Sequence, residues 1–190
     1  MRFSNQNTYS ASNTLIVICL FTTLVVLNFP HLYILWMNTF FLERWSYWTY
    51  IIQLFSSQFI HWSIFHFIFN ALFIYLFWNI VEKILWIQKY IIFFIFSSVF
   101  IWISLTLFTD WNTVWISWFA MALLSYYTLE LYYKNDIEYK WWISALIINI
   151  WVWFTPWISL VGHFTWAIAG VLFYYIYRKY FSVKYVWIEL

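Results

Sequence analysis

Two histidines and an asparagine, His61, His66 and Asn70, share one apolar stretch of the chain. Ser117 and His163 follow much further along, each at the start of another apolar run. Polar and ionisable groups are costly inside a membrane and tend to be functional there. A serine and a distant histidine on separate membrane helices therefore indicate a nucleophile and its base.

The chemistry that these residues could perform is acyl transfer on a peptide bond. The Ser117 hydroxyl would attack the carbonyl carbon while His163 takes its proton and later passes it to the leaving amine. No carboxylate lies near His163 in the sequence, so a dyad is favoured over a triad. His66 and Asn70 are four residues apart on one helix face and could hold the oxyanion together with the Ser117 backbone N–H.

Structural roles compete with each of these assignments. A membrane-helix serine often bonds to its own backbone, a buried histidine can simply pair with a neighbour, and His61 could only order the loop before its helix. Zinc peptidases would need His-Glu-x-x-His on a helix, which is absent, and no metal or cofactor is expected. A small transporter should carry acidic groups within its spans, and Glu130 is the only candidate for such a group.

The composition sets the class of protein. Of 190 residues, 66% are hydrophobic and 8% are charged, whereas soluble domains carry about 25% charged residues. This predicts an all-α integral membrane protein with room for six transmembrane helices of about 20 residues. The single cysteine, Cys19, excludes an intrachain disulfide, and a net charge of +2 gives no reason to expect nucleic acid.

Apolar runs and polar breaks divide the chain into segments. We expect a polar N-terminal segment (1–13), a six-helix membrane domain (14–181) and a short cytoplasmic tail (182–190), with the first span retained rather than cleaved. A long aromatic connection, about 30–60, should form a loop with interfacial helices. The predicted spans are roughly 14–29, 62–80, 90–108, 117–133, 142–154 and 163–177.

The basic residues give the orientation. Eight of the nine Lys and Arg residues fall on one side of these spans, and only Arg44 falls on the other. The positive-inside rule then predicts cytoplasmic termini and an external first loop. This orientation places Ser117 and His163 at the external ends of their helices. Neither residue was used in the charge count, so their location on the same side independently supports the pairing.

These residues resemble the rhomboid family of intramembrane serine proteases over about 48–177. The family's second core helix carries a histidine, a second histidine five residues on and an asparagine four residues later, matched here by His61, His66 and Asn70. The other matching motif positions are Trp78, Glu82 and Trp86, then Trp115-Ile116-Ser117-Trp118, then His163, Trp166 and Gly170. The resemblance implies a six-span bundle, the Ser117–His163 dyad, an oxyanion site at His66 and Asn70, and supporting roles for His61, Glu82 and Gly170.

The departures from the family pattern are all of one kind: the sequence has tryptophan where the family has glycine. Glycine lets membrane helices approach closely, so these exchanges would wedge helices apart. The chain has 17 Trp and only 2 Gly, against a usual glycine content of about 7%. We hypothesise that the gene reads UGA as glycine, whereas the alternative is a set of genuine interfacial tryptophans. The five positions concerned are Trp78, Trp86, Trp115, Trp118 and Trp166.

The sequence as a whole predicts an intramembrane serine endopeptidase of the bacterial inner membrane that cleaves transmembrane proteins within the lipid bilayer. The alternative is an inactive rhomboid-like protein that binds transmembrane segments without cutting them. Tryptophan at positions 115, 118 and 166 would favour this alternative.

Overall fold

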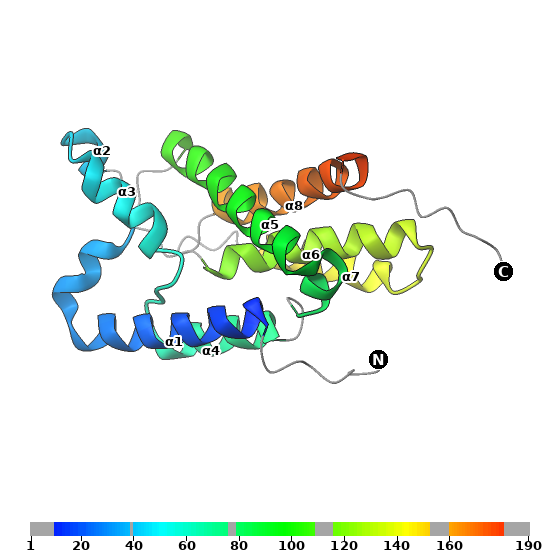
Figure 1. Cartoon of the computed structure of the whole chain (residues 1–190), viewed down its shortest axis with the longest axis horizontal. Coiled ribbons are helices and arrows are strands. Elements are labelled where there is room, and N and C mark those ends of the chain that lie inside the picture. Colours follow the sequence, from blue (N-terminus) through cyan, green and yellow to red (C-terminus); the bar gives the residue numbers. More distant parts are fainter. Residues whose placement is uncertain (1–9, 39, 76–78, 109–115, 153–159, 181–190) are drawn as a thin grey trace.

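A computed structural model of the chain describes residues 10–38, 40–75, 79–108, 116–152 and 160–180. Within these ranges, only the helical backbone is described for residues 116–118, 150–152 and 160–163. Helices form the regular structure of the described chain (Figure 1). In chain order they are α1 (Ala11–Asn28), the 3-10 helix η1 (Pro30–Leu35), α2 (Phe40–Glu43), α3 (Tyr47–Ser56), α4 (Ile64–Phe73), α5 (Asn79–Phe108), α6 (Ile116–Tyr133), α7 (Tyr139–Val152) and α8 (Leu160–Tyr180).

Capping serines set the beginnings of two helices. Ser10 precedes α1 and accepts the Asn13 backbone N–H at 3.0 Å, and Ser63 precedes α4 and accepts the His66 N–H at 3.1 Å. A side-chain oxygen at this position satisfies one of the unpaired N–H groups of the first turn. At its other end, α1 stops before Pro30, which opens η1.

Helix α6 occupies the centre of the bundle. It packs against α4, α5, α7 and α8, and all of its side chains from Phe119 to Tyr126 are buried. A helix enclosed by other helices need not be uniformly apolar, which explains how α6 accommodates Ser125 and Thr128. The sequence predicted this helix at nearly the same bounds, 117–133.

Helices α6 and α8 approach each other closely at Gly170. A Cβ atom at position 170 would lie 2.1 Å from Ser125 Oγ and 2.2 Å from the Ala122 backbone oxygen, both on α6. No real side chain could occupy that space without moving the α6 backbone. Ser125 reinforces the contact by donating a hydrogen bond to the Ala167 backbone oxygen at 2.9 Å. Small residues that let backbones approach are the usual means of joining membrane helices.

The connection between α1 and α4 contains η1, α2 and α3, which confirms the predicted helical segments of this loop. Gln53 of α3 holds the connection together. Its side-chain amide donates to the Ile34 backbone oxygen at 2.7 Å and accepts the Asn38 backbone N–H at 3.1 Å. The Gln53 side chain is almost fully buried, so these bonds are shielded from competing water.

The second and third predicted spans correspond to helices with somewhat different bounds. The second span was expected over 62–80, and the chain there is helical through α4 and the π-helical residues 74 and 75, after which residues 76–78 lie outside the described chain. Helix α5 starts at Asn79, before the expected 90, and contains a break at Trp86 where the backbone leaves the helical region. Among the described helices, α1 and α5 have the length and apolarity needed to cross a membrane.

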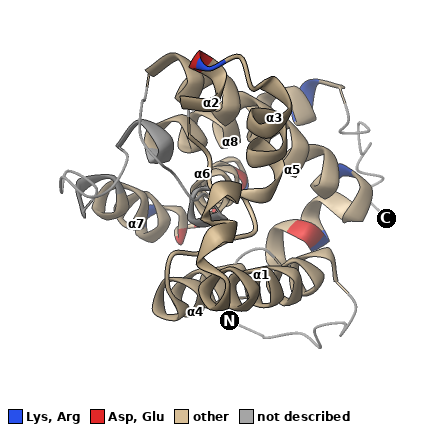
Figure 2. Cartoon of the chain, turned by 90° about the vertical axis from the view of Figure 1, so that its left-hand side faces the viewer, with Lys and Arg blue, Asp and Glu red and all other residues tan. Residues whose placement is uncertain are grey.

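Charged residues are sparse, and most of the ribbon is uncharged (Figure 2). In Figure 1, the start of α1, the start of α5, the α6–α7 turn and the end of α8 lie toward one end of the molecule, whereas α2 and α3 lie at the other. The first end carries Lys83, Lys134 and Arg178, and Arg44 follows α2. The orientation in the membrane that the charge asymmetry favours stays a prediction.

Replacing Gly170 with alanine should weaken the α6–α8 contact. The added methyl group would overpack the contact, so we expect the free energy of unfolding in detergent to fall by about 1–3 kcal/mol. Ile168→Ala changes a partly exposed residue on the same helix and should stay within about 0.5 kcal/mol of the parent. Equal stability of Gly170→Ala and the parent chain would contradict the close approach.

Candidate active site

The predicted nucleophile and base lie near the beginnings of two neighbouring helices. Ser117 is the second residue of α6, and His163 is the fourth residue of α8. Their side chains lie outside the described part of the structure, so their placement here is that of the helical backbone.

Contacts further along α6 and α8 fix how the two helices run. The ring centroids of Phe119 and Trp166 are 5.5 Å apart, Ser125 bonds to Ala167, and the Tyr133 and Tyr175 hydroxyls are 3.3 Å apart. Residue numbers rise together on both helices, so the helices are parallel, as Figure 1 also shows. Positions 117 and 163 precede the Phe119–Trp166 contact by two and three residues, which brings them to the same end of the pair.

His66 and Asn70 lie one turn apart on α4, which packs against α6. Asn70 is 8% exposed. The buried Asn70 Nδ2 and His66 Nδ1 atoms have no hydrogen-bond partner among the described residues. Buried polar atoms are nearly always paired, and an exception calls for an explanation. An amide and an imidazole that hold unused hydrogen-bonding capacity could serve a ligand or a reacting oxyanion.

His61 precedes α4 and is held by α1 rather than by its own helix. The His61 backbone N–H donates to Thr23 Oγ1 at 3.2 Å, and the same hydroxyl lies 3.0 Å from His61 Nδ1. When the hydroxyl donates to Nδ1, the neutral ring carries its proton on Nε2. The ring packs against those of His66 and Phe67, with centroids 5.2 and 5.4 Å away. These contacts hold the His61 ring beside that of His66.

Glu82 anchors the start of α1 to the first turn of α5. Its carboxylate accepts the backbone N–H groups of Ala11 and Ser12 at 2.9 and 3.0 Å, and the Ser12 hydroxyl at 2.6 Å. The Tyr90 hydroxyl lies 3.2 Å from Ser12 Oγ. A carboxylate at a helix N-terminus also interacts favourably with the helix dipole. Glu82 thus holds α1, which in turn holds His61.

The five motif tryptophans fall in different settings. Trp78 and Trp115 lie outside the described residues, and Trp118 is described by its helical backbone alone. Trp86 is 75% exposed, whereas Trp166 is 1% exposed at the α6–α8 contact. The indole at position 166 is therefore buried at the α6–α8 contact, three residues after His163 in the sequence.

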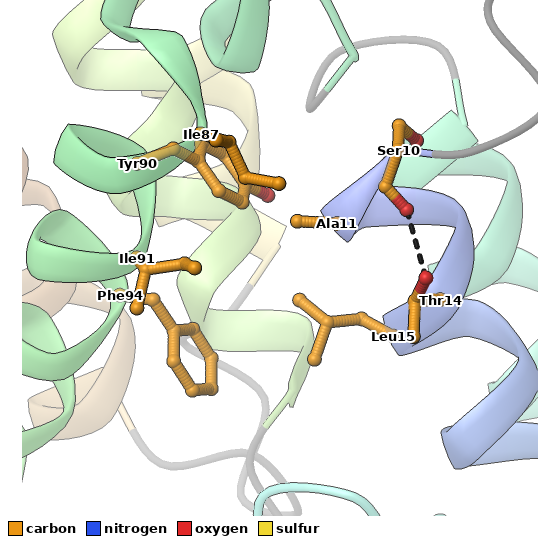
Figure 3. A pocket seen from close by; sticks show the side chains of 8 residues that line it. All are labelled: Ser10, Ala11, Thr14, Leu15, Ile87, Tyr90, Ile91 and Phe94. Atoms are coloured by element: carbon orange, nitrogen blue, oxygen red, sulfur yellow. Dashed lines mark hydrogen bonds between the residues drawn. The ribbon is translucent and has the colours of Figure 1, made fainter.

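An apolar groove of about 480 Å³ lies between α1 and α5, away from the predicted catalytic residues. Figure 3 shows Leu15 of α1 facing Ile91 and Phe94 of α5 across it. Its lining includes Tyr90, next to the Glu82 anchor. Within the described ranges, no three His, Cys, Asp or Glu side chains gather as a metal site.

Comparison with models of protein families shows to which family the chain belongs. The model of the Rhomboid domain matches residues 44–180, which includes α3 to α8 and all the candidate site residues. The chain belongs to the rhomboid family. It is accordingly a membrane protein built as a helical bundle. No curated protein gives a significant match to the sequence.

The sequence alone did not identify Thr23 as the hydrogen-bond partner of His61. Thr23 lies in the middle of the first span and is completely buried, so nothing in its spacing linked it to His61, 38 residues away. The available signal was a hydroxyl in an otherwise apolar run, which also describes Thr22. Only the packing of α1 against α4 tells the two residues apart.

Thr23→Val should remove both hydrogen bonds to His61 while keeping the volume of the side chain. It leaves a buried N–H and a buried ring nitrogen unpaired, so we expect the free energy of unfolding to fall by about 1–3 kcal/mol. Nitrogen-15 NMR of labelled histidine should show His61 losing its single tautomer. Thr23→Ser keeps the hydroxyl and should preserve the tautomer. An unchanged His61 spectrum in Thr23→Val would rule out this contact.

Proposed function

We propose that the chain is an intramembrane serine endopeptidase that cleaves transmembrane proteins with Ser117 as nucleophile and His163 as general base. The parallel packing of α6 on α8 carries this proposal, since it brings the two first turns to one end of the helix pair. A Ser–His pair needs this proximity, because the base must reach the hydroxyl proton directly.

The reaction would follow the usual course of serine acyl transfer. Ser117 Oγ attacks the peptide carbonyl carbon as His163 removes its proton. The tetrahedral intermediate then collapses, the C–N bond breaks, and the proton held by His163 passes to the leaving amine. Water, activated by His163, releases the acyl group from Ser117 and regenerates the hydroxyl.

The oxyanion of the intermediate would be held by His66, Asn70 and the Ser117 backbone N–H. His66 Nδ1 and Asn70 Nδ2 have no hydrogen-bond partner among the described residues, which supports these roles, since pre-placed donors cost no rearrangement during the reaction. His61 would be a positioning residue that packs against His66, and it depends on Thr23 for its own orientation. Glu82 and Gly170 would act through the positions of α1 and α8.

The proposed setting is the bacterial inner membrane, with six spans and both termini in the cytoplasm. Helices α1, α4 with the first turns of α5, the rest of α5, α6, α7 and α8 would be the six spans. Ser117 and His163 would then lie near the external face, where water can enter. Single-span proteins in the same bilayer are the proposed substrates.

The second candidate function is binding of transmembrane segments without cleavage. One observation favours it, because Trp166 fills the α6–α8 contact one turn from His163. A bulky indole there leaves little room for a substrate backbone beside the dyad. This candidate applies only to a protein that carries tryptophan at position 166.

Ser117→Ala separates the two functions. Cleavage of a single-span reporter in proteoliposomes should fall to background, because loss of a serine nucleophile costs on the order of 10⁶-fold in turnover. Ser144→Ala is the matched control, since this α7 serine bonds only to its own helix and its loss should leave cleavage unchanged.

Ser117→Ala and Ser144→Ala should also be compared in a second parent chain that carries glycine at positions 115, 118 and 166. Absence of cleavage in both parent chains, with reporter binding retained, would reject the protease and establish the binding protein. Cleavage that survives Ser117→Ala would reject the dyad.

A further inference from the structure

Three residues in the described chain have positive φ angles, and two of them are tryptophan. The φ angles are 59° at Trp45, 63° at Trp86 and 55° at Asn135. An L-amino acid with a side chain is strained in this region, whereas glycine enters it freely. Asparagine is the other residue that tolerates it well, and a bulky aromatic residue is an outlier there.

Trp45 occupies the position after α2 that most often requires glycine. The Ser46 N–H bonds to the Phe41 backbone oxygen at 2.8 Å, and the Trp45 N–H bonds to the Leu42 oxygen at 3.1 Å. This pair of bonds defines a Schellman motif, in which the residue at the C′ position has a left-handed backbone and is usually glycine. Here that residue is Trp45.

The end of α6 provides a comparison within the same chain. The Asp136 N–H bonds to the Leu131 oxygen at 3.0 Å, and the Asn135 N–H bonds to the Tyr132 oxygen at 3.1 Å. The motif is the same, and its C′ residue is asparagine, the accepted substitute for glycine. The fold therefore uses this helix ending twice, once with a suitable residue and once with tryptophan.

Trp86 is the more extreme case. Its φ of 63° and ψ of 150° fall at the edge of a region that is essentially restricted to glycine. This is the point where the helical path from Asn79 breaks before continuing to Phe108. The backbone geometry at position 86 thus requires glycine independently of any sequence motif.

Neither indole is buried against described residues in a way that would offset this strain. Trp45 is 78% exposed and Trp86 is 75% exposed. The ring contact of Trp45 is an edge-on approach to Tyr47, with centroids 5.8 Å apart. A residue forced into an unfavourable backbone conformation is normally held there by surrounding structure, which these two side chains lack.

A third tryptophan, Trp166, is unfavourable for a different reason, which is its buried indole N–H group. Trp166 is 1% exposed, and its indole N–H has no hydrogen-bond partner among the described residues. Buried tryptophans usually find a partner for this group. Glycine at position 166 would remove the orphan donor from the α6–α8 contact, four residues before Gly170.

We propose that the natural protein contains glycine at positions 45, 86 and 166, because the cell that makes it translates UGA codons as glycine. The positive φ at Trp45 indicates glycine at a position outside the five motif positions. The inference rests on backbone angles and burial and is independent of the proposed protease activity. It also removes the main steric objection to that activity.

Tandem mass spectrometry of the protein purified from its natural host tests the proposal directly. The peptide spanning positions 43–49 should read glycine at 45 and tryptophan at 48, because position 48 lies in helix α3, where glycine is unfavourable. The peptide spanning 84–89 should read glycine at 86, and that spanning 164–170 should read glycine at 166. Tryptophan at any of the three positions overturns the proposal there, whether or not the protein cleaves substrates.

Thermal unfolding of recombinant variants tests the physical argument separately. Trp45→Gly should raise the midpoint of unfolding in detergent above that of Trp45→Ala, because both remove the indole but only glycine relieves the backbone. The same order should hold for glycine and alanine at position 86. Trp48→Gly, inside a helix, should lower the midpoint relative to Trp48→Ala. Equal midpoints for glycine and alanine at both 45 and 86 would refute the backbone requirement.

Discussion

The close approach of α6 and α8 at Gly170 is the constraint on which the rest of the bundle depends. With no side chain at this position, the α8 backbone comes close enough to α6 that a single methyl group would collide with Ser125 and the Ala122 carbonyl. The contact fixes the two helices in a parallel register. That register, rather than any single bond near the site, is what brings the first turns of both helices together.

Hydrogen bonds of buried polar groups join α1 to α5 and to the residues before α4. Glu82 binds the first turn of α1, and Thr23, further along the same helix, binds His61 ahead of α4. Each anchor is protected from water, so each is worth more than a surface contact, and each would be costly to leave unpaired. The arrangement links the two ends of the membrane domain, because one helix carries both anchors.

Much of this could be read from the sequence, and the exceptions have physical causes. Apolar runs predicted α1, α6 and α8, and the four-residue spacing of His66 and Asn70 predicted one helix face. The break at Trp86 was missed, because an apolar tryptophan carries no signal for a positive φ. Thr23 was missed because its partner is distant in sequence. The roles of Ser117 and His163 remain predictions, and so do those of Trp78 and Trp115, which lie outside the described chain.

The most direct test of the central claim is labelling of the protein, purified from its natural host, with a fluorophosphonate that reacts only with activated serines. If α6 and α8 hold Ser117 beside His163, mass spectrometry should find the label on Ser117, and His163→Ala in the same sequence background should abolish it. Labelling that is absent from Ser117, or that persists without His163, would contradict the account.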